Sequence, residues 1–511
     1  MGAAFLCSSG GGAGGSSSAR AHEIYVKGPA NVTVTATKGE TTYTKTTDSN
    51  GEALLKGLEP GDWTVAITDG ELYASKVVTV EADYNIPIYF FSATIHVTYP
   101  AGSASHIEGP NDFYAQSPDT SGSWTCTVPS AGDYMVCADD SSTGDGAYKT
   151  VSITEDGQVV NVELSYLKIY GIYRDITASS PDWAREDDAV GKTATASVGT
   201  VAGQSDFNNC YPWSGIARET LSTGDVMVKI PKFWYQRYRE DNIEHIKISN
   251  LPTDGFVLHP AFNHAGLEKE CLYVGAYKMS SGYMSVSGVS PLASVTRADF
   301  RTNSAAKGSG WGIVDIAAWS AIQMLILVEF ATNDVQTAIG QGYVNGSSAI
   351  SVGSCDSVPN LTGIPAGTNG QVDVVWRGIE GFWGNLNEYI DGINYSGNKP
   401  YVCNDPNSYA DGTSANYTLL SYTSPSAVDG TYIKQVGLDA ANPHIMLPTT
   451  GGGGTSTYYC DKYINASGWR NCRVGGYYSS NHGSGLFMTN VNQSTTYKAA
   501  SIGSRLQYIP Q

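Results

Sequence analysis

The segment WRGIEGFWGNLNEYIDGIN, Trp376 to Asn394, decides the fold of the second half of the chain. Four glycines, two tryptophans and three acids in so short a segment do not describe a regular strand or helix. They predict tight turns packed by indole rings, with backbone approaching backbone at the glycines. We expect Glu380, Glu388 and Asp391 to accept hydrogen bonds from N–H groups of the loops. A catalytic or cation-binding carboxylate set is the alternative.

A second informative segment, residues 468–506, encloses a polar interval between core-like stretches. Arg473–Gly476, Gly485–Phe487 and Ile502–Arg505 form the apolar and glycine-rich frame. The interval is rich in Tyr, Ser, Asn and His, which adaptable binding surfaces use as rigid rings and small hydrogen-bonding groups. A plain polar loop is the alternative. The predicted ligand-binding residues are Tyr477, Tyr478, Ser480, Asn481, His482, Ser484, Asn490 and Asn492.

The longest apolar stretch, IVDIAAWSAIQMLILVEFA, predicts a buried amphipathic helix that begins after Asp315 and needs a large opposing core. Because it carries Asp315 and Glu329 and has no flanking basic residues, it does not suit a membrane span. We expect Glu329 to bond a neighbouring loop. The chain start, MGAAFLC, has neither the basic region nor the apolar length of a signal peptide.

Two shorter patterns add local predictions. Thr296 and Asp299 have the spacing of a helix cap, which predicts a second helix that ends near Gly308. The four glycines at 451–454 predict a mobile loop.

The first third of the chain contains an internal repeat. DSNGEALLKGLEPGDWTVAI recurs as DTSGSWTCTVPSAGDYMVCA, so that the turn Gly61-Asp62-Trp63 corresponds to Gly132-Asp133-Tyr134. Alternating apolar residues around each turn predict short, half-buried strands. The two copies resemble the prealbumin-like or carboxypeptidase-regulatory-like β-sandwich modules that serve as spacers. We therefore expect a flexible Gly/Ser-rich arm at 1–22, β-sandwiches at 23–92 and 93–166, and a larger domain at 167–511.

Composition excludes several functional classes. The 511 residues carry 48 acidic and 30 basic side chains, a net charge of −18, which disfavours binding to a nucleic-acid backbone. Only 15% of the residues are charged. The chain has 33 tyrosines and only 12 phenylalanines, which favours rings placed with one edge in water. The chain is expected to be mostly β with a few helices and to present polar aromatic surface.

The nine cysteines are widely spread and lack zinc-site spacing, so most are expected to be free buried thiols. Cys126 and Cys137 are the best candidates for a disulfide. His259 and His264 flank a proline and do not share a helix face, so we expect no zinc pair there.

The segment Gly384–Glu388, the two strand frames at 473–476 and 502–505, and the preceding apolar helix together resemble the C-type lectin fold of phage receptor-binding proteins. Many members of that group are variable proteins of diversity-generating retroelements. The segments YGIYRDITASSPDWAREDDAVG and GDVMVKIPKFWYQR are similar to regions of phage structural proteins that carry this domain. The resemblance covers residues 167–511 and implies a C-type lectin-like α+β domain with a diversified surface at about 469–505.

The resemblance also implies a function. It suggests a non-enzymatic virion protein of a tail or head fibre that binds a host cell-surface protein or glycan. Its arm would attach to other virion proteins, and it would be a homo-oligomer, with a trimer favoured. It implies no cofactor, no nucleic acid and no membrane insertion; lectin-like folds hold Ca²⁺ only sometimes, which stays open.

Three other functions remain as alternatives, two of them enzymatic. The same fold serves formylglycine-generating enzymes, which place a cysteine pair after an Arg-Gly-Gly-Ser segment; here Tyr477 and Tyr478 follow the glycines, and Cys460 and Cys472 precede them. A glycan-acting enzyme would use Glu380, Glu388 or Asp391. A purely structural virion decoration protein would pack the C-terminal surface against a neighbour.

Overall fold

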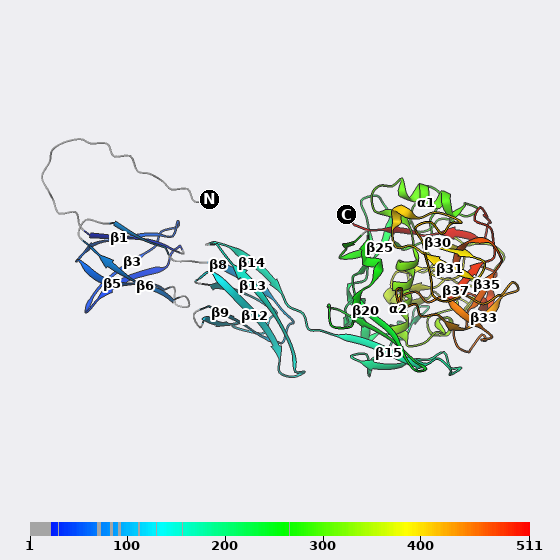
Figure 1. The fold of residues 1–511 in the computed structure, drawn as a ribbon, viewed down its shortest axis with the longest axis horizontal. Helices are drawn as coiled ribbons and strands as arrows, with labels where there is room; N and C mark the ends of the chain where they lie inside the picture. Colours follow the sequence, from blue (N-terminus) through cyan, green and yellow to red (C-terminus); the bar gives the residue numbers. More distant parts are fainter. Residues whose placement is uncertain are drawn as a thin grey trace. The chain divides into compact units, whose positions relative to one another are not determined.

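The computed structural model describes residues 22–510 except 29, 69–72, 82–84, 90–92, 111–112, 129, 156 and 265; the side chains of 73, 74, 85–87, 89 and 264 are also outside the described set. Apart from His22, the predicted arm lies outside the described residues. The chain divides into two compact units, Met1–Leu167 and Lys168–Gln511, termed the N-terminal and C-terminal units (Figure 1). The prediction of a mostly β protein with few helices is confirmed.

The N-terminal unit contains two β-sandwiches with the same strand order. The first pairs sheet β4-β1-β7 with sheet β3-β2-β5-β6, and the second pairs β11-β8-β14 with β10-β9-β12-β13. Each strand of the second copy is thus the seventh strand after its counterpart. The strands of the first sandwich are β1 His22–Lys27, β2 Thr33–Lys38, β3 Thr41–Thr46, β4 Glu52–Leu58, β5 Gly61–Thr68, β6 Tyr73–Val80 and β7 Asn85–Tyr89. Those of the second are β8 Ala93–Thr98, β9 Ala104–Gly109, β10 Phe113–Gln116, β11 Ser123–Val128, β12 Gly132–Asp140, β13 Asp145–Ile153 and β14 Val159–Glu163.

The repeated turn has the same role in both copies. Gly61 and Gly132 begin β5 and β12 with φ of 127° and 143°, a conformation that favours glycine. Two residues later, Trp63 and Tyr134 point into the separate cores of their sandwiches and are buried. The sequence repeat is therefore a structural repeat.

The main cysteine prediction is confirmed, but the candidate disulfide between Cys126 and Cys137 does not form. Cys126 lies on β11 and Cys137 on β12, strands of different sheets, and no disulfide joins them. Cys126 faces the core, whereas Cys137 lies on the outer side of its sheet, because the inward positions alternate with it at Val136 and Ala138. The eight cysteines in the described part of the chain are buried and lie outside any disulfide, as the residue pattern favoured.

The C-terminal unit is built from several sheets around one helix. A nine-stranded sheet has the order β32-β31-β30-β36-β37-β35-β33-β34, with β38 also paired to β30. Its strands are β30 Asn387–Ser396, β31 Lys399–Val402, β32 Thr418–Leu419, β33 Thr431–Val436, β34 Pro448–Gly451, β35 Lys462–Asn465, β36 Trp469–Gly475, β37 Gly485–Val491 and β38 Ile502–Ser504.

Smaller sheets complete this unit. One has the order β16-β15-β21-β20-β22, another β18-β19-β25-β39-β26, a third β17-β27-β28-β29, and β23 pairs with β24. Their bounds are β15 Ile169–Asp175, β16 Ala184–Asp187, β17 Ser197–Val198, β18 Ala217–Thr220, β19 Val226–Pro231, β20 Trp234–Glu240, β21 Ile243–Ser249, β22 Val257–Leu258, β23 Asn263–His264, β24 Leu267–Glu268, β25 Cys271–Gly275, β26 Trp311–Ile313, β27 Gly363–Ile364, β28 Val375–Trp376, β29 Ile379–Glu380 and β39 Leu506–Tyr508. The α-helices are α1 Arg297–Ala305, α2 Ile316–Phe330 and α3 Val335–Ala338.

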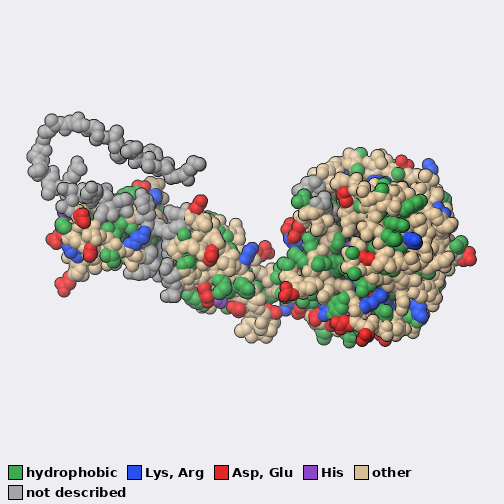
Figure 2. All heavy atoms as spheres, viewed as in Figure 1, with side chains coloured by type: hydrophobic (Ala, Val, Ile, Leu, Met, Phe, Trp, Pro, Cys, Tyr) green, Lys and Arg blue, Asp and Glu red, His purple; other side chains and the backbone are tan. Residues whose placement is uncertain are grey.

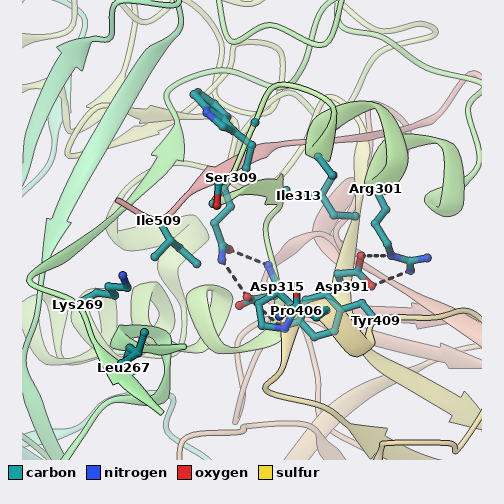
Figure 3. Close-up of a pocket in the computed structure, with 17 residues that line it drawn as sticks. Leu267, Lys269, Arg301, Ser309, Ile313, Asp315, Asp391, Pro406, Tyr409 and Ile509 are labelled. Atoms are coloured by element: carbon teal, nitrogen blue, oxygen red, sulfur yellow. Dashed lines mark hydrogen bonds and ion pairs between the residues drawn. The ribbon is translucent and has the colours of Figure 1, made fainter. Parts of the chain in front are cut away.

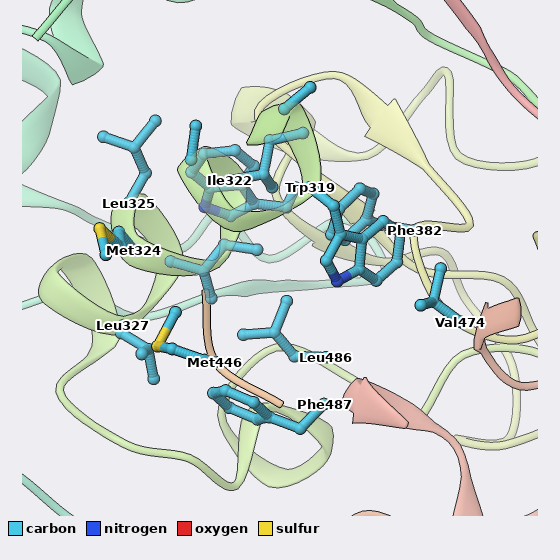
Figure 4. Packing of buried hydrophobic residues seen from close by; sticks show 14 of the residues in the cluster. Trp319, Ile322, Met324, Leu325, Leu327, Phe382, Met446, Val474, Leu486 and Phe487 are labelled. Carbon is cyan, nitrogen blue, oxygen red and sulfur yellow. The ribbon is translucent and has the colours of Figure 1, made fainter. Parts of the chain in front are cut away.

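Helix α2 is the centre of the C-terminal core. Asp315 caps it, accepting a hydrogen bond from Ala318 N at 2.8 Å, as predicted. The helix is not amphipathic, however, because every residue from Ile316 to Glu329 is buried. Trp319 stacks on Phe382 with ring centroids 3.8 Å apart (Figure 4). This contact packs α2 against residues 376–394, termed the glycine-rich segment. Among the described residues, no helix is both long and apolar enough to cross a bilayer.

Of the remaining local predictions, those for Glu329 and for the cap of the second helix are confirmed, and the one for the glycine run is wrong. Glu329 accepts hydrogen bonds from Arg377 and Ser205 on neighbouring loops, as expected, and from Trp376 of β28. Helix α1 begins after its predicted cap, Thr296, and ends at Ala305. The glycine run is not a free loop, because Gly451 belongs to β34 and Gly453 N donates to Tyr432 O at 3.0 Å.

Candidate functional site

The turn at 477–483, between β36 and β37, is held by its main chain. Tyr478 N donates to Asn385 O at 2.9 Å, and Tyr478 O accepts from Gly346 N at 2.6 Å. Asn481 N donates to Val344 O at 3.1 Å, and Ser480 N and Gly483 N close the turn internally. Peptide groups of two other segments therefore fix the backbone of this turn, largely independently of which side chains it carries.

The side chains of the turn face outward. Ser479, Asn481 and His482 are exposed, and Tyr477, Tyr478 and Ser480 are half-buried. The two tyrosine rings meet edge to face at 5.2 Å, an arrangement that limits their rotamers. Five of the eight predicted binding residues, Tyr477, Tyr478, Ser480, Asn481 and His482, thus lie together on one turn.

Two of these side chains also have internal partners. Ser480 Oγ accepts from Tyr477 N at 3.0 Å, which stiffens the turn. His482 Nδ1 lies 2.9 Å from Gln341 Nε2, so that the ring is held against the 341–346 loop.

The surface around the turn includes residues that the sequence reasoning missed. The loop that receives the turn carries Tyr343 and Asn345, of which Asn345 is exposed. The next segment contributes Asn369, whose Oδ1 accepts from Gln341 N at 2.7 Å. Their segments, 341–350 and 364–372, contain no charged residue. The sequence could have indicated this loop, because 341–348 (QGYVNGSS) contains the Tyr, Ser, Asn and Gly residues that also mark the turn.

Contrary to the prediction, three of the predicted binding residues do not belong to this surface. Ser484 is fully buried, because the chain re-enters the sheet there and packs against Gly476, where an added Cβ would lie 2.2 Å from Ser484 Oγ. Asn490 is only 7% exposed, and its Oδ1 accepts from Arg473 Nη2 at 2.7 Å. Asn492 Oδ1 accepts from the same Arg473 atom at 2.5 Å and is half-buried. Asn490 and Asn492 therefore hold an arginine at the other end of β37.

The three acids of the glycine-rich segment are nearly inaccessible, each at most 1% exposed. Glu380 accepts from Gly353 N at 2.6 Å and Cys355 N at 2.9 Å, the loop N–H contacts that were expected. Burial, with the neighbouring Asp373 carboxylate, raises the pKa of Glu380 to about 7.

Glu388 and Asp391 bond cations instead. Glu388 pairs with Lys278 at 2.6 Å and Arg505 at 2.8 Å, and Asp391 receives two hydrogen bonds from Arg301. Burial alone would raise the pKa of Glu388, but Arg505 and Lys278 hold it below its usual range. Within the described residues, no group of three or more His, Cys, Asp or Glu side chains could hold a metal ion.

Two buried histidines lie in the core of the same unit. His259 and His444 are 5.4 Å apart in a T-shaped contact, and Tyr235 contacts both rings. Burial, together with the charge of Arg237, lowers the pKa of His444 to about 3, and burial lowers that of His259 well below its usual value. The side chain of His264 lies outside the described residues, so the predicted absence of a zinc pair remains a prediction.

The depressed pKa of His444 predicts a pH-dependent stability. Between pH 6.5 and about 3 the unfolded chain protonates this histidine and the folded chain does not, so folding loses stability as the pH falls. The stability deficit of His444→Gln relative to the parent protein should therefore shrink by about 1 kcal/mol between pH 7 and pH 5.5. Urea titrations at both pH values measure this change. The exposed His482→Gln is the control, and a deficit for His444→Gln that is equal at both pH values would contradict the prediction.

Comparison with known proteins gives distant similarities only. No family model and no curated protein matches the chain. The P3c and U1 variants of Major Tropism Determinant align with 73% of this chain and 81% of their own, at 11% and 12% identity and TM-scores of 0.24 and 0.23. The Bacillus anthracis TIE protein aligns over 50% of this chain at 9% identity and a TM-score of 0.13; the chain spans 45% of that protein. The shaft pilin SpaA of Lactobacillus rhamnosus GG aligns over 98% of its length with 28% of this chain, at 11% identity and a TM-score of 0.12.

Proposed function

We propose that the C-terminal unit is the non-enzymatic receptor-binding head of a virion protein with a C-type lectin-like, diversifiable surface. Its target would be a protein or glycan on the bacterial host surface. The observation that supports this is the turn at 477–483, whose backbone is bonded by peptide groups while its side chains face outward. Apart from Ser480, whose hydroxyl bonds Tyr477 N, such a turn can change its side chains without changing its path.

The chemistry of the surface suits recognition. Tyr477 and Tyr478 provide large rings that lose little conformational entropy on binding, and Ser, Asn and His side chains provide adaptable hydrogen bonds. The segments around the turn, 341–350 and 364–372, carry no charged residue, and most of the face of the C-terminal unit in Figure 2 is uncharged. Binding would therefore depend on ring burial and hydrogen bonds, with weak dependence on salt.

The other parts of the chain have supporting roles in this proposal. The two β-sandwiches act as spacers, and residues 1–22 attach the protein to other virion components. A homo-oligomer, with a trimer favoured, would add avidity to weak single sites.

The proposal predicts separate effects on binding and folding. Replacing Tyr477, Tyr478, Asn481 and His482 together with alanine should weaken binding to host cells at least about 30-fold, the effect of losing one strong tyrosine contact. The melting temperature should change little, since none of the four side chains lies in the core.

The matched control replaces two exposed residues of another loop, Thr455→Ala and Ser456→Ala, and should bind normally. Cell binding is measured by flow cytometry with labelled protein, and folding by calorimetry. Unchanged binding by the folded quadruple variant would reject the turn as the receptor site. Protection of 477–482 from solvent in the assembled particle would instead favour the decoration role.

A further inference from the structure

A cavity of about 380 Å³ lies in the C-terminal unit, apart from the turn at 477–483 (Figure 3). Helix α1, strands β24, β26 and β39 and the segment at 406–409 surround it, and it shares no lining residue with the turn. The volume lies near the lower end of the range for small-ligand sites, about 300–1,000 Å³. It therefore suits a single ring-sized ligand.

Two buried carboxylates form the polar floor of this cavity. Asp315 accepts from Ala318 N, Gln507 Nε2 and Tyr409 Oη at 2.8, 2.9 and 3.1 Å. Asp391 accepts from Arg301 Nε and Nη2 at 2.6 and 2.8 Å and from its neighbour Gly392 N. These bonds fix the positions of both carboxylates before any ligand enters.

The count of donors leaves one acceptor position on each carboxylate. A carboxylate has about four lone-pair sites, and three donors from the described chain reach each of these two. Hydrogen-bond donors also line the cavity, from Lys269, Ser309 and Asn407. The site thus offers both acceptors and donors, the combination that hydroxyl groups require.

The walls combine apolar and polar surface. Ile313 and Ile509 are buried beside the polar floor, and Trp311, Pro406 and Leu267 also line the cavity. Trp311 is stacked on Tyr508 with centroids 4.7 Å apart, which fixes the indole. A ligand with C–H faces as well as hydroxyl groups would bury area against these walls.

Because acidic and basic side chains both line the cavity, neither a simple anion nor a simple cation is favoured. An anion would meet Asp315 and Asp391, and a cation would meet Arg301 and Lys269. A purely apolar ligand would cover the carboxylates without supplying donors. We propose that this cavity binds a neutral, polyhydroxylated ring, one monosaccharide unit of a glycan, at a site distinct from the receptor-binding turn.

Saturation-transfer-difference NMR tests this with four separate probes: glucose, galactose, mannose and N-acetylglucosamine. The full chain should transfer saturation to the ring protons of at least one sugar. Gly312→Leu should reduce that transfer at least tenfold, because a Cβ at Gly312 meets no atom within 4 Å and the larger side chain would occupy the cavity. Ala306→Leu, at an exposed residue of the same region outside the cavity, is the matched control.

The result of this experiment does not depend on the turn at 477–483. The absence of transfer to all four sugars, or equal transfer in the parent chain and Gly312→Leu, would overturn the proposal. If Gly312→Leu does not fold, Ser309→Trp at the exposed rim serves as the second blocking variant, with the same expected loss. The quadruple alanine variant of the turn should retain full transfer, so that failure of the receptor proposal and failure of this one are distinguishable.

Discussion

Replacing Glu388 with leucine should lower the free energy of unfolding of the C-terminal unit by about 3–5 kcal/mol. The substitution leaves two cations, Lys278 and Arg505, buried without the carboxylate that both contact. Water cannot solvate them there, because the side chains of all three residues are at most 1% exposed. Both cations also bond main-chain carbonyls, at Gly381 and Gly275, so their displacement would disturb β25 and the glycine-rich segment together.

The matched control is Glu268→Ala, which removes a partner of Lys232. That ion pair has the same N–O distance, 2.6 Å, but Glu268 is 49% exposed. Solvent should replace the lost contact, with a cost within about 1 kcal/mol. Denaturant titration of both variants measures the difference, and equal losses would show that burial does not set the strength of the Glu388 network.

The repeat in the N-terminal unit could be predicted because its signal is local. A glycine with positive φ followed two residues later by a buried ring marks the start of β5 and of β12. Helix α2 was predicted in position, but its environment was not. Apolar residues at helical spacing indicate one buried face, whereas the packing of Trp319 against Phe382 and of several strands around the helix buries all of them.

The residue types of the binding surface could be predicted, but the positions of these residues in the sheet could not. Residue types mark Tyr477 and Tyr478 as surface candidates, but they do not reveal that β37 begins at Gly485 and buries Ser484. Asn490 has the same chemistry as Asn481 and yet lies opposite Arg473 in the sheet. The partner loop around Tyr343 is more than a hundred residues earlier in the chain, and only the tertiary fold brings it to the turn.

Replacing Asn385 with alanine should destabilise the C-terminal unit by about 2–4 kcal/mol and also weaken binding to host cells. Asn385 has φ of 59°, and its side chain bonds Ile350 N and Ile350 O, both at 3.1 Å. Alanine loses both bonds and is strained in the left-handed conformation. Because Asn385 O accepts from Tyr478 N, a shift of this residue moves the turn although no side chain of the turn has changed.

Asn385→Gly separates the two contributions. Glycine adopts the positive φ without strain but also lacks the side-chain bonds, so it should be about 1 kcal/mol more stable than Asn385→Ala and should bind comparably poorly. Calorimetry gives the stabilities, and the cell-binding assay gives the effect on the turn. If Asn385→Ala folds and binds host cells as the parent protein does, the glycine-rich segment does not position the turn. Weak binding by both variants, with Tyr477 to His482 intact, would show that the surface functions only when Asn385 holds the backbone of the turn in position.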